Sequence, residues 1–228
     1  LKEISAIADT CSVREVLTLD ENGTGSLTDR AAEQATKFET VARAADDLAA
    51  ILYTSGTTGR SKGAMLTHDN LASNARTLHK HWGFTEGDVL LHALPIFHVH
   101  GLFVALHCAL LNASKLIFLK KFDPAVIIAN LPSSTVFMGV PTFYVRLLAE
   151  DGFTKETFNA FEERTGHVIL ERYGMTEAGM ITSNPYDGER KAGTVGFPLD
   201  NAVRIADEDG NILPDGEIGI LEIKGPNV

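Results

Sequence analysis

The sequence predicts an α/β protein with mostly parallel sheets covered by helices, followed by a small antiparallel β unit. Strands are expected to alternate with helices along most of the chain, which is typical of a parallel sheet with helical connections. The strand segments are mostly apolar instead of alternating between apolar and polar residues, as is typical of strands buried on both faces. Near the end of the chain, Asp209-Gly210 and Asp215-Gly216 lie between short apolar segments, which indicates hairpins.

The first part of the chain leads to a loop that is rich in glycine and hydroxyl residues. Residues 46–53 turn from acidic to apolar and predict a buried strand that ends at this loop. The elements expected here are, in order, a short strand at 12–20, a glycine-rich turn at 21–25, a polar helix at 27–45, the buried strand at 46–53, and a helix at 71–82 that His68 and Asp69 cap.

The middle of the chain repeats a strand–helix pattern in which prolines mark boundaries. Pro95 stops a strand, Asp123-Pro124 opens a helix with a cap and a proline, and Pro141 begins another helix. The expected strands cover 88–94, 115–119 and 135–140, and the expected helices cover 101–111, the segment after 123, and 142–150. A helix at 157–164 then follows with no strand before it, so a strand is expected to be missing near Lys155-Glu156.

Composition argues against some classes of protein. The 228 residues carry 20 Lys and Arg against 30 Asp and Glu, and this formal net charge of −10 disfavours a general nucleic-acid binder. The longest apolar run, 101–113, contains His107 and Asn112 and is too short for a membrane span. Two distant cysteines, Cys11 and Cys108, and the lack of a secretory signal favour a reducing compartment. We therefore expect a cytoplasmic protein that binds small molecules rather than nucleic acid or membranes.

The strongest functional signal is the loop from Tyr53 to Gly63. It holds three glycines, five Ser or Thr hydroxyls and two cations in eleven residues, directly after an expected core strand. Glycines let successive backbone N–H groups turn toward one anion, hydroxyls add donors and cations add charge, so this composition indicates a triphosphate site. The spacing differs from that of the Walker P-loop. A flexible surface loop is the alternative, but flexibility does not require this density of hydroxyls.

This loop resembles the phosphate-loop signature of the adenylate-forming enzymes, the family of acyl-CoA synthetases, luciferases and peptide-synthetase adenylation domains. Further stretches agree with this family in order and rough spacing, and together the motifs are highly specific. They are Leu94-Pro95-Ile96-Phe97-His98-Val99-His100-Gly101, then Tyr173-Gly174-Met175-Thr176-Glu177, and finally Gly193-Thr194-Val195-Gly196-Phe197-Pro198 with Pro214-Asp215-Gly216-Glu217-Ile218-Gly219. The resemblance covers nearly the whole chain.

The resemblance implies a two-step reaction and roles for the matching residues. A carboxylate attacks the α-phosphate of ATP, giving an acyl-adenylate and pyrophosphate, and coenzyme A then takes the acyl group. Glu177 would hold the Mg²⁺ that this family uses, Thr176 would donate to the α-phosphate, and His98 would lie beside the acyl pocket. The phosphate-binding residues would be Thr54, Ser55, Gly56, Thr57, Thr58 and Lys62, and the adenine-binding residues Tyr173, Gly174 and Met175.

In detail the sequence looks most like the malonyl-CoA synthetase branch of this family. In that branch the arginine that matches Arg146 pairs with the distal carboxylate of malonate, for which a planar guanidinium is well suited. We therefore expect activation of malonate or methylmalonate. Alternatives are a surface position for Arg146, a synthetase for another small or aromatic acid, and a non-catalytic nucleotide-binding module. The intact Thr176-Glu177 pair argues against the last of these.

The resemblance also implies a division of the chain. We expect an α/β block with the phosphate loop at 1–90, a second α/β block with the acyl pocket at 91–195, and the start of a β subdomain at 196–228. The chain begins at Leu1 and ends after an expected strand, without the family's C-terminal domain. We therefore expect a fragment of the large N-terminal domain with little activity of its own.

Overall fold

The computed structural model describes residues 2–54, 60–149, 162 and 168–228, and the chain divides into two compact units, 1–42 and 43–228. The first unit contains two short helices, α1 (Lys2–Thr10) and α2 (Ser26–Ala32). Between them, the Asp20 carboxylate accepts hydrogen bonds from the backbone N–H groups of Asn22 and Thr24. This geometry confirms the predicted glycine-rich turn.

Two other predictions for the first unit are wrong. Residues 12–20 form no strand, because no strand among the described residues pairs with their backbone. The helix predicted at 27–45 ends at Ala32. Residues 33–44 are exposed throughout, and a helix that buries no apolar face gains too little to offset its nucleation cost.

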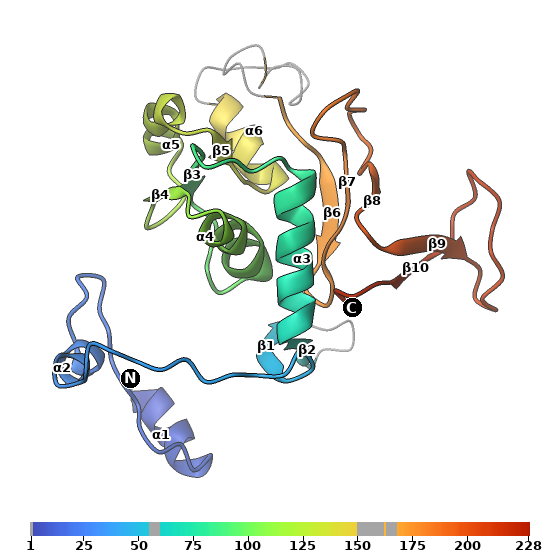
Figure 1. Cartoon of the computed structure of the whole chain (residues 1–228). Helices are drawn as coiled ribbons and strands as arrows, with labels where there is room; N and C mark the ends of the chain where they lie inside the picture. Colours follow the sequence, from blue (N-terminus) through green and yellow to red (C-terminus); the bar gives the residue numbers. More distant parts are fainter. Residues whose placement is uncertain (1, 55–59, 150–161, 163–167) are drawn as a thin grey trace. The chain divides into compact units, whose positions relative to one another are not determined.

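A three-stranded parallel sheet forms the core of the second unit (Figure 1). It consists of β3 (Val89–His92), β4 (Lys115–Phe118) and β5 (Val136–Phe137) in the order β4-β3-β5. Successive side chains of a strand point to opposite faces, so Leu90 packs in one hydrophobic cluster and Leu91 in another. Both residues are fully buried, which confirms the prediction of a parallel sheet covered on both faces.

Helices supply the cover on each side of this sheet. The Leu90 cluster includes side chains from α3 (His68–His81), from the π-helical segment η1 (His100–Leu106) and from its continuation α4 (His107–Leu111). The Leu91 cluster includes side chains from α5 (Pro124–Asn130), the 3₁₀ turn η2 (Leu131–Ser133) and α6 (Pro141–Ala149). All the helices predicted between residues 71 and 149 are therefore present.

The structure confirms one of the two predicted helix caps and contradicts the other. Asp123 caps α5 as predicted, because its carboxylate accepts a hydrogen bond from the backbone N–H of Val126 at 3.2 Å. The cap predicted for α3 at His68 and Asp69 is wrong. Thr67 is the N-cap, and it forms a reciprocal capping box with Asn70.

An antiparallel hairpin brackets the glycine- and hydroxyl-rich loop. Its strands are β1 (Leu48–Thr54) and β2 (Lys62–Thr67), and Thr54 pairs with Lys62 where the loop leaves the hairpin. The strand predicted at 46–53 is present, but its predicted burial is wrong, since alternate residues are exposed and Tyr53 is 75% exposed. The sequence prediction missed β2, so the loop joins two antiparallel strands instead of a strand and a helix.

A second antiparallel sheet lies along α3 (Figure 1). It contains β6 (Arg172–Met175), β7 (Gly179–Ser183) and β8 (Phe197–Pro198) in that order. The buried Asn74 of α3 attaches to β7, because its Nδ2 donates to the carbonyl of Met180 at 2.9 Å and its Oδ1 accepts from the N–H of Met180 at 3.2 Å. Eight residues on, the Trp82 Nε1 donates to the Ser183 hydroxyl.

The last pair of strands confirms the predicted antiparallel β unit. β9 (Ala202–Ala206) pairs with β10 (Ile220–Lys224), and Gly210 and Gly216 adopt φ angles of 84° and 93° in the connection. The predicted gap near Lys155-Glu156 and the helix at 157–164 lie outside the described residues, and the block boundaries at 90 and 195 stay predictions. Within the described part of the chain, no helix combines the length and apolar character that crossing a membrane requires.

Candidate active site

A cavity of about 650 Å³ lies at the carboxyl end of β5, beside β6. Its lining comes mainly from the loop after β3, from the loop between β5 and α6 with the start of α6, and from β6 with the residues on either side of it; Met180 and Val195 complete it. The carboxyl ends of parallel strands are where open α/β sheets bind ligands. The cavity brings together five residues that the sequence analysis singled out, namely His98, Tyr173, Gly174, Met175 and Thr176.

Much of the rest of the cavity wall is apolar. Tyr144 of α6 lies on this wall, and burial raises the pKa of its hydroxyl above the ordinary value, so the group is protonated at neutral pH. The aliphatic side chains that complete the wall are Val99, Val140, Val145, Ile169, Leu170 and Val195, together with the thioethers of Met175 and Met180. A wall with a few polar groups among many apolar ones is typical of a small-molecule site.

The β6–β7 hairpin has space for only hydrogen at two glycines. A side chain on Gly174 would place its Cβ 2.4 Å from the carbonyl oxygen of Gly179. Gly179 itself adopts a φ of +63°, and its Cβ would lie 2.5 Å from the Oδ1 of Asn74. This tight turn presents Thr176 half-buried at the cavity and leaves Glu177 exposed.

Arg172 and His100 lie next to each other on the wall of the cavity. The Arg172 guanidinium stacks over the Trp82 ring at 5.0 Å and donates a hydrogen bond from Nη2 to the Nε2 of His100. Burial first, and then the nearby Arg172 charge, lower the pKa of His100 to about 3. An arginine side chain can only donate, so His100 is neutral at physiological pH and carries its proton on Nδ1.

His98 is held by the backbone of the same loop. Its Nδ1 accepts a hydrogen bond from the backbone N–H of His100 at 3.2 Å, so the neutral ring carries its proton on Nε2. Its side chain is exposed and lines the cavity. Gly101 permits this loop, because a Cβ there would lie 2.2 Å from the carbonyl oxygen of Pro95.

The remaining predicted residues lie elsewhere or outside the described part. Thr54 and Lys62 stand opposite each other at the end of the β1–β2 hairpin and do not line the cavity. Ser55, Gly56, Thr57 and Thr58 fall outside the described residues. Glu177 lies on the β6–β7 turn, next to the cavity-lining Thr176. The structure therefore brings His98 and residues 173–176 to one cavity, and the roles predicted for all of the site residues stay predictions.

Arg146 is not brought to the cavity. Its guanidinium lies over the Phe122 ring at 4.8 Å, and its side chain is exposed on α6. Its neighbours Tyr144 and Val145 line the cavity, whereas Arg146 does not. The geometry does not support the predicted contact between Arg146 and a substrate carboxylate, and that contact stays a prediction.

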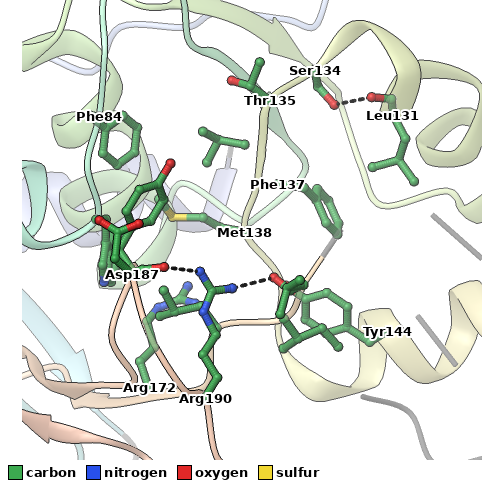
Figure 2. A pocket seen from close by; sticks show the side chains of 16 residues that line it. Phe84, Leu131, Ser134, Thr135, Phe137, Met138, Tyr144, Arg172, Asp187 and Arg190 are labelled. Atoms are coloured by element: carbon green, nitrogen blue, oxygen red, sulfur yellow. Dashed lines mark hydrogen bonds between the residues drawn. The ribbon is translucent and has the colours of Figure 1, made fainter. Parts of the chain in front are cut away.

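A second cavity, of about 440 Å³, is drawn in Figure 2. Residues 134–138 of β5 and its flanks form one wall, and Arg172 and Arg190 project into the cavity from the opposite wall. Arg190 is fully engaged by backbone carbonyls, since its three nitrogens donate to those of Pro185, Val168 and Tyr186. Arg172 lines both cavities.

Arg172 was not among the predicted site residues, and His100 was named only as part of the motif that ends at Gly101. Arg172 directly precedes the Tyr-Gly-Met-Thr-Glu motif, and the exposure of β6 alternates so that Arg172 and Gly174 point inward. The strand was not predicted, and without it this alternation could not be used. The available signal was the position of Arg172 two residues before Gly174, because residues two apart on a strand point to the same face of the sheet.

A parallel sheet with a cavity at the carboxyl ends of its strands is the architecture of a ligand-binding α/β enzyme domain. The family described as AMP-binding enzyme matches residues 1–228, and the chain belongs to this family. The assignment agrees with the resemblance found in the sequence motifs.

Curated relatives include several malonate–CoA ligases. The chain is 37% identical over 229 residues to the malonate–CoA ligase of Arabidopsis thaliana, covering 84% of the chain and 37% of that protein. It is 40% identical over 185 residues to the mitochondrial malonate–CoA ligase of Xenopus laevis, covering 66% of the chain and 32% of that protein. The chain thus spans about a third of the length of these relatives.

Solved structures confirm the fold class. The chain is 53% identical to the ATP-bound MatB from Rhodopseudomonas palustris, with a TM-score of 0.93 over 100% of the chain and 49% of that protein. It is 34% identical to a malonyl-CoA ligase whose ternary product complex holds methylmalonyl-CoA and AMP, with a TM-score of 0.71 over 81% of the chain and 45% of that protein.

Proposed function

We propose that the protein that carries this chain activates a small dicarboxylic acid, malonate or methylmalonate, with ATP and transfers it to coenzyme A. The observation that carries the proposal is the cavity itself. It joins the Tyr-Gly-Met-Thr-Glu hairpin to the loops after β3 and β5, in a chain 53% identical to an ATP-bound MatB. The names of the curated relatives support the choice of acid.

The reaction brings two anions together, so it depends on hydrogen-bond donors and positive charge. A carboxylate oxygen of the acid attacks the α-phosphorus, and pyrophosphate leaves with the electrons of the broken P–O bond. Thr176, at the edge of the cavity, donates its hydroxyl to an α-phosphate oxygen and stabilises the charge that develops there. The thiol of coenzyme A then attacks the acyl carbon, loses its proton, and AMP leaves.

The nucleotide is held by residues from two hairpins in this proposal. Tyr173, Gly174 and Met175 line the cavity and hold the adenine, with the exposed Tyr173 ring available for stacking. Thr54, Ser55, Gly56, Thr57, Thr58 and Lys62 hold the β- and γ-phosphates. His98 lines the same cavity, and its Nε2 is not used by the hydrogen bond within its own loop.

The residues present fit a magnesium ion that is held mainly by nucleotide phosphates. Glu177 is an exposed carboxylate without a hydrogen bond or ion pair inside the described ranges, and no cluster of three His, Cys, Asp or Glu side chains occurs there. Mg²⁺ is commonly bound by one or two carboxylates together with substrate phosphates, so Glu177 would hold it. When bound, the ion neutralises phosphate charge.

The test is a pyrophosphate-release assay with ATP and Mg²⁺ on the protein at its full natural length. Malonate, methylmalonate, acetate and octanoate serve as substrates, and mass spectrometry identifies the thioester. We expect release with malonate or methylmalonate and none above background with octanoate. Release with octanoate or acetate but not with the dicarboxylic acids would refute the choice of acid, and no release with any acid would refute the activity.

A matched pair of variants tests the role of Thr176. Thr176→Val removes the hydroxyl at nearly constant volume and should lower kcat about 100-fold, since removing one donor to a developing anion has that effect. Thr40→Val makes the same change at an exposed position outside the cavity and should leave kcat unchanged. Equal kcat values for the two variants would remove Thr176 from the mechanism.

A cytoplasmic location stays a prediction.

A further inference from the structure

A short loop at residues 191–196 supplies one side chain to the wall of the cavity of about 650 Å³. That side chain is Val195, which is 45% exposed. The loop turns at Gly193 and Gly196, whose φ angles of 77° and 74° lie in the left-handed region that favours glycine. A Cβ on Gly196 would lie 2.0 Å from the carbonyl oxygen of Ser183. The loop therefore lies directly against the end of β7.

One buried amide side chain holds this loop in place. Asn184 follows β7 directly and is 4% exposed. Its Nδ2 donates to the carbonyl of Thr194 at 2.7 Å, and its Oδ1 accepts from the backbone N–H of Lys191 at 3.2 Å. The Thr194 carbonyl belongs to the peptide bond that leads into Val195. Asn184 thus fixes both the start of the loop and the peptide before its cavity-lining residue.

The same amide joins the loop to the segment before β6. The Nδ2 of Asn184 also donates to the carbonyl of Glu171 at 3.2 Å, and its backbone N–H donates to that carbonyl at 2.9 Å. Glu171 lines the cavity, and its Oε2 accepts from the backbone N–H of Gly193 at 2.8 Å. Asn184 therefore uses both kinds of amide group, donor and acceptor, to connect two segments of the cavity wall.

The position of the loop depends on these bonds, because residues 191–196 belong to no helix or strand. We infer that Asn184 is a positioning residue for the reaction, which holds Val195 in the cavity wall against the bound acyl-adenylate. The inference rests on the proposed function for the identity of that ligand. A wall that is fixed beforehand binds more tightly than one that must be ordered when the ligand enters.

Asn112 provides a matched contrast for a role in stability alone. Its Nδ2 donates to the carbonyl of Thr85 and to the hydroxyl of Ser114, and its Oδ1 contacts the ring of His79. These four residues are not among those that line the cavity. Asn112→Ala thus removes a comparable set of hydrogen bonds, and it should lower stability without changing the binding of a ligand.

Equilibrium binding tests the inference without turnover. The probe is a malonyl-adenylate analogue in which a sulfamoyl group replaces the α-phosphate, measured by calorimetry on the protein at its full natural length. Val195→Ala removes apolar surface from the wall and should weaken binding about fivefold. Asn184→Ala should weaken binding by at least the same factor, and Asn112→Ala should leave it unchanged. The double variant of Asn184→Ala and Val195→Ala should bind about as weakly as Asn184→Ala alone, because the valine has already left the wall.

Amide hydrogen exchange gives a readout that does not depend on any ligand. Exchange at residues 191–196 should be faster in Asn184→Ala than in the wild type, because the loop loses the side chain that holds it. Exchange there should be unchanged in Asn112→Ala, whatever that substitution costs in stability. Equal exchange of the loop in Asn184→Ala and in the wild type would overturn the inference.

Several binding results would also overturn it. They are a wild type that does not bind the analogue, an unchanged affinity in either single variant, and effects that multiply in the double variant. The fluorescence of Trp82 during urea unfolding reports whether Asn184→Ala folds. If it does not fold, Asn184→Asp decides, because it keeps the acceptor for Lys191 and loses the donor. A loss of affinity that is smaller in the Val195→Ala background supports the role, and an equal loss contradicts it.

Pyrophosphate release separates this inference from the proposed function. Wild-type protein that binds the analogue with the expected pattern among the variants, but releases no pyrophosphate with any acid, would support the role of Asn184 and refute the reaction. Wild-type protein that releases pyrophosphate with malonate, while Asn184→Ala binds the analogue as tightly as the wild type, would support the reaction and refute the role of Asn184.

Discussion

The contact between Asn74 and β7 gives the sharpest stability prediction. Asn74 is 6% exposed, and its side chain makes both a donor and an acceptor hydrogen bond with the backbone of Met180. Asn74→Ala removes the hydrogen-bond partner of both the carbonyl and the N–H of Met180, which are buried. At about 1–3 kcal/mol for each such group, with partial relief by water or by Asn227, we expect a loss of about 2–4 kcal/mol of unfolding free energy.

Gly179 makes the reasoning testable by a double-mutant cycle. Gly179→Ala should cost about 1–2 kcal/mol for its left-handed backbone, and more because the new Cβ meets the Oδ1 of Asn74 at 2.5 Å. Asn74→Ala removes that oxygen. The cost of Gly179→Ala should therefore be smaller in the Asn74→Ala background than in the wild type, which gives a favourable coupling between the two substitutions.

Urea unfolding followed by the fluorescence of Trp82 is the appropriate assay. Trp82 is the one tryptophan among the 228 residues, and its indole donates to Ser183 of β7, so it reports on this packing directly. Arg76→Ala, on the exposed side of α3, is the control and should change the free energy by less than about 0.5 kcal/mol. A loss below about 1 kcal/mol for Asn74→Ala, or additive effects of the two substitutions, would refute the reasoning.

Three further predictions concern single side chains. The pKa of His100 is lowered to about 3 in the folded protein, so below about pH 6.5 the unfolded chain binds more protons than the folded one, and stability should fall as the pH falls. The free energy of unfolding in urea should therefore depend less on pH in His100→Gln than in the wild type. An unchanged pH dependence in this variant would contradict the prediction. Burial raises the pKa of the Cys108 thiol to about 12, whereas Cys11 is exposed. A thiol reagent should therefore label Cys11 quickly in the native protein and Cys108 only when the protein unfolds. Fast labelling of both cysteines would show that Cys108 is accessible. Glu177→Gln should raise the Mg²⁺ concentration needed for pyrophosphate release. It should leave the urea midpoint of unfolding unchanged, because Glu177 is exposed. An unchanged Mg²⁺ requirement would exclude Glu177 as a ligand of the ion.

The apolar strands and their helices were predictable because both signals are local. Residues 88–94 are mostly apolar and do not alternate with polar residues, and β3 is buried as that pattern predicts. The Asp123-Pro124 cap and the Pro141 start of α6 follow from the chemistry of single residues. The strand expected at 12–20 failed because a strand needs a partner, and the sequence does not show which segments pair.

The site was predictable where a motif lies inside one element and less so where it depends on packing. Tyr173 to Thr176 meet His98 at one cavity, as the motif resemblance led us to expect. The predicted contact between Arg146 and a substrate carboxylate stays a prediction. The orientation of a helical side chain depends on how the helix packs, and here the Arg146 side chain stacks on Phe122. Arg172 was overlooked because its inward direction depends on the register of β6 against β7.

The fate of one oxygen atom tests the central claim most directly. If malonate is activated as an acyl-adenylate, a carboxylate oxygen forms the new bond to the α-phosphorus and leaves with AMP when coenzyme A takes the acyl group. The protein at its full natural length is incubated with ATP, Mg²⁺, coenzyme A and ¹⁸O-labelled malonate, and AMP is analysed by mass spectrometry. We predict one ¹⁸O atom in each AMP formed, together with malonyl-CoA. Unlabelled AMP, or ADP as the nucleotide product, would contradict the proposed reaction.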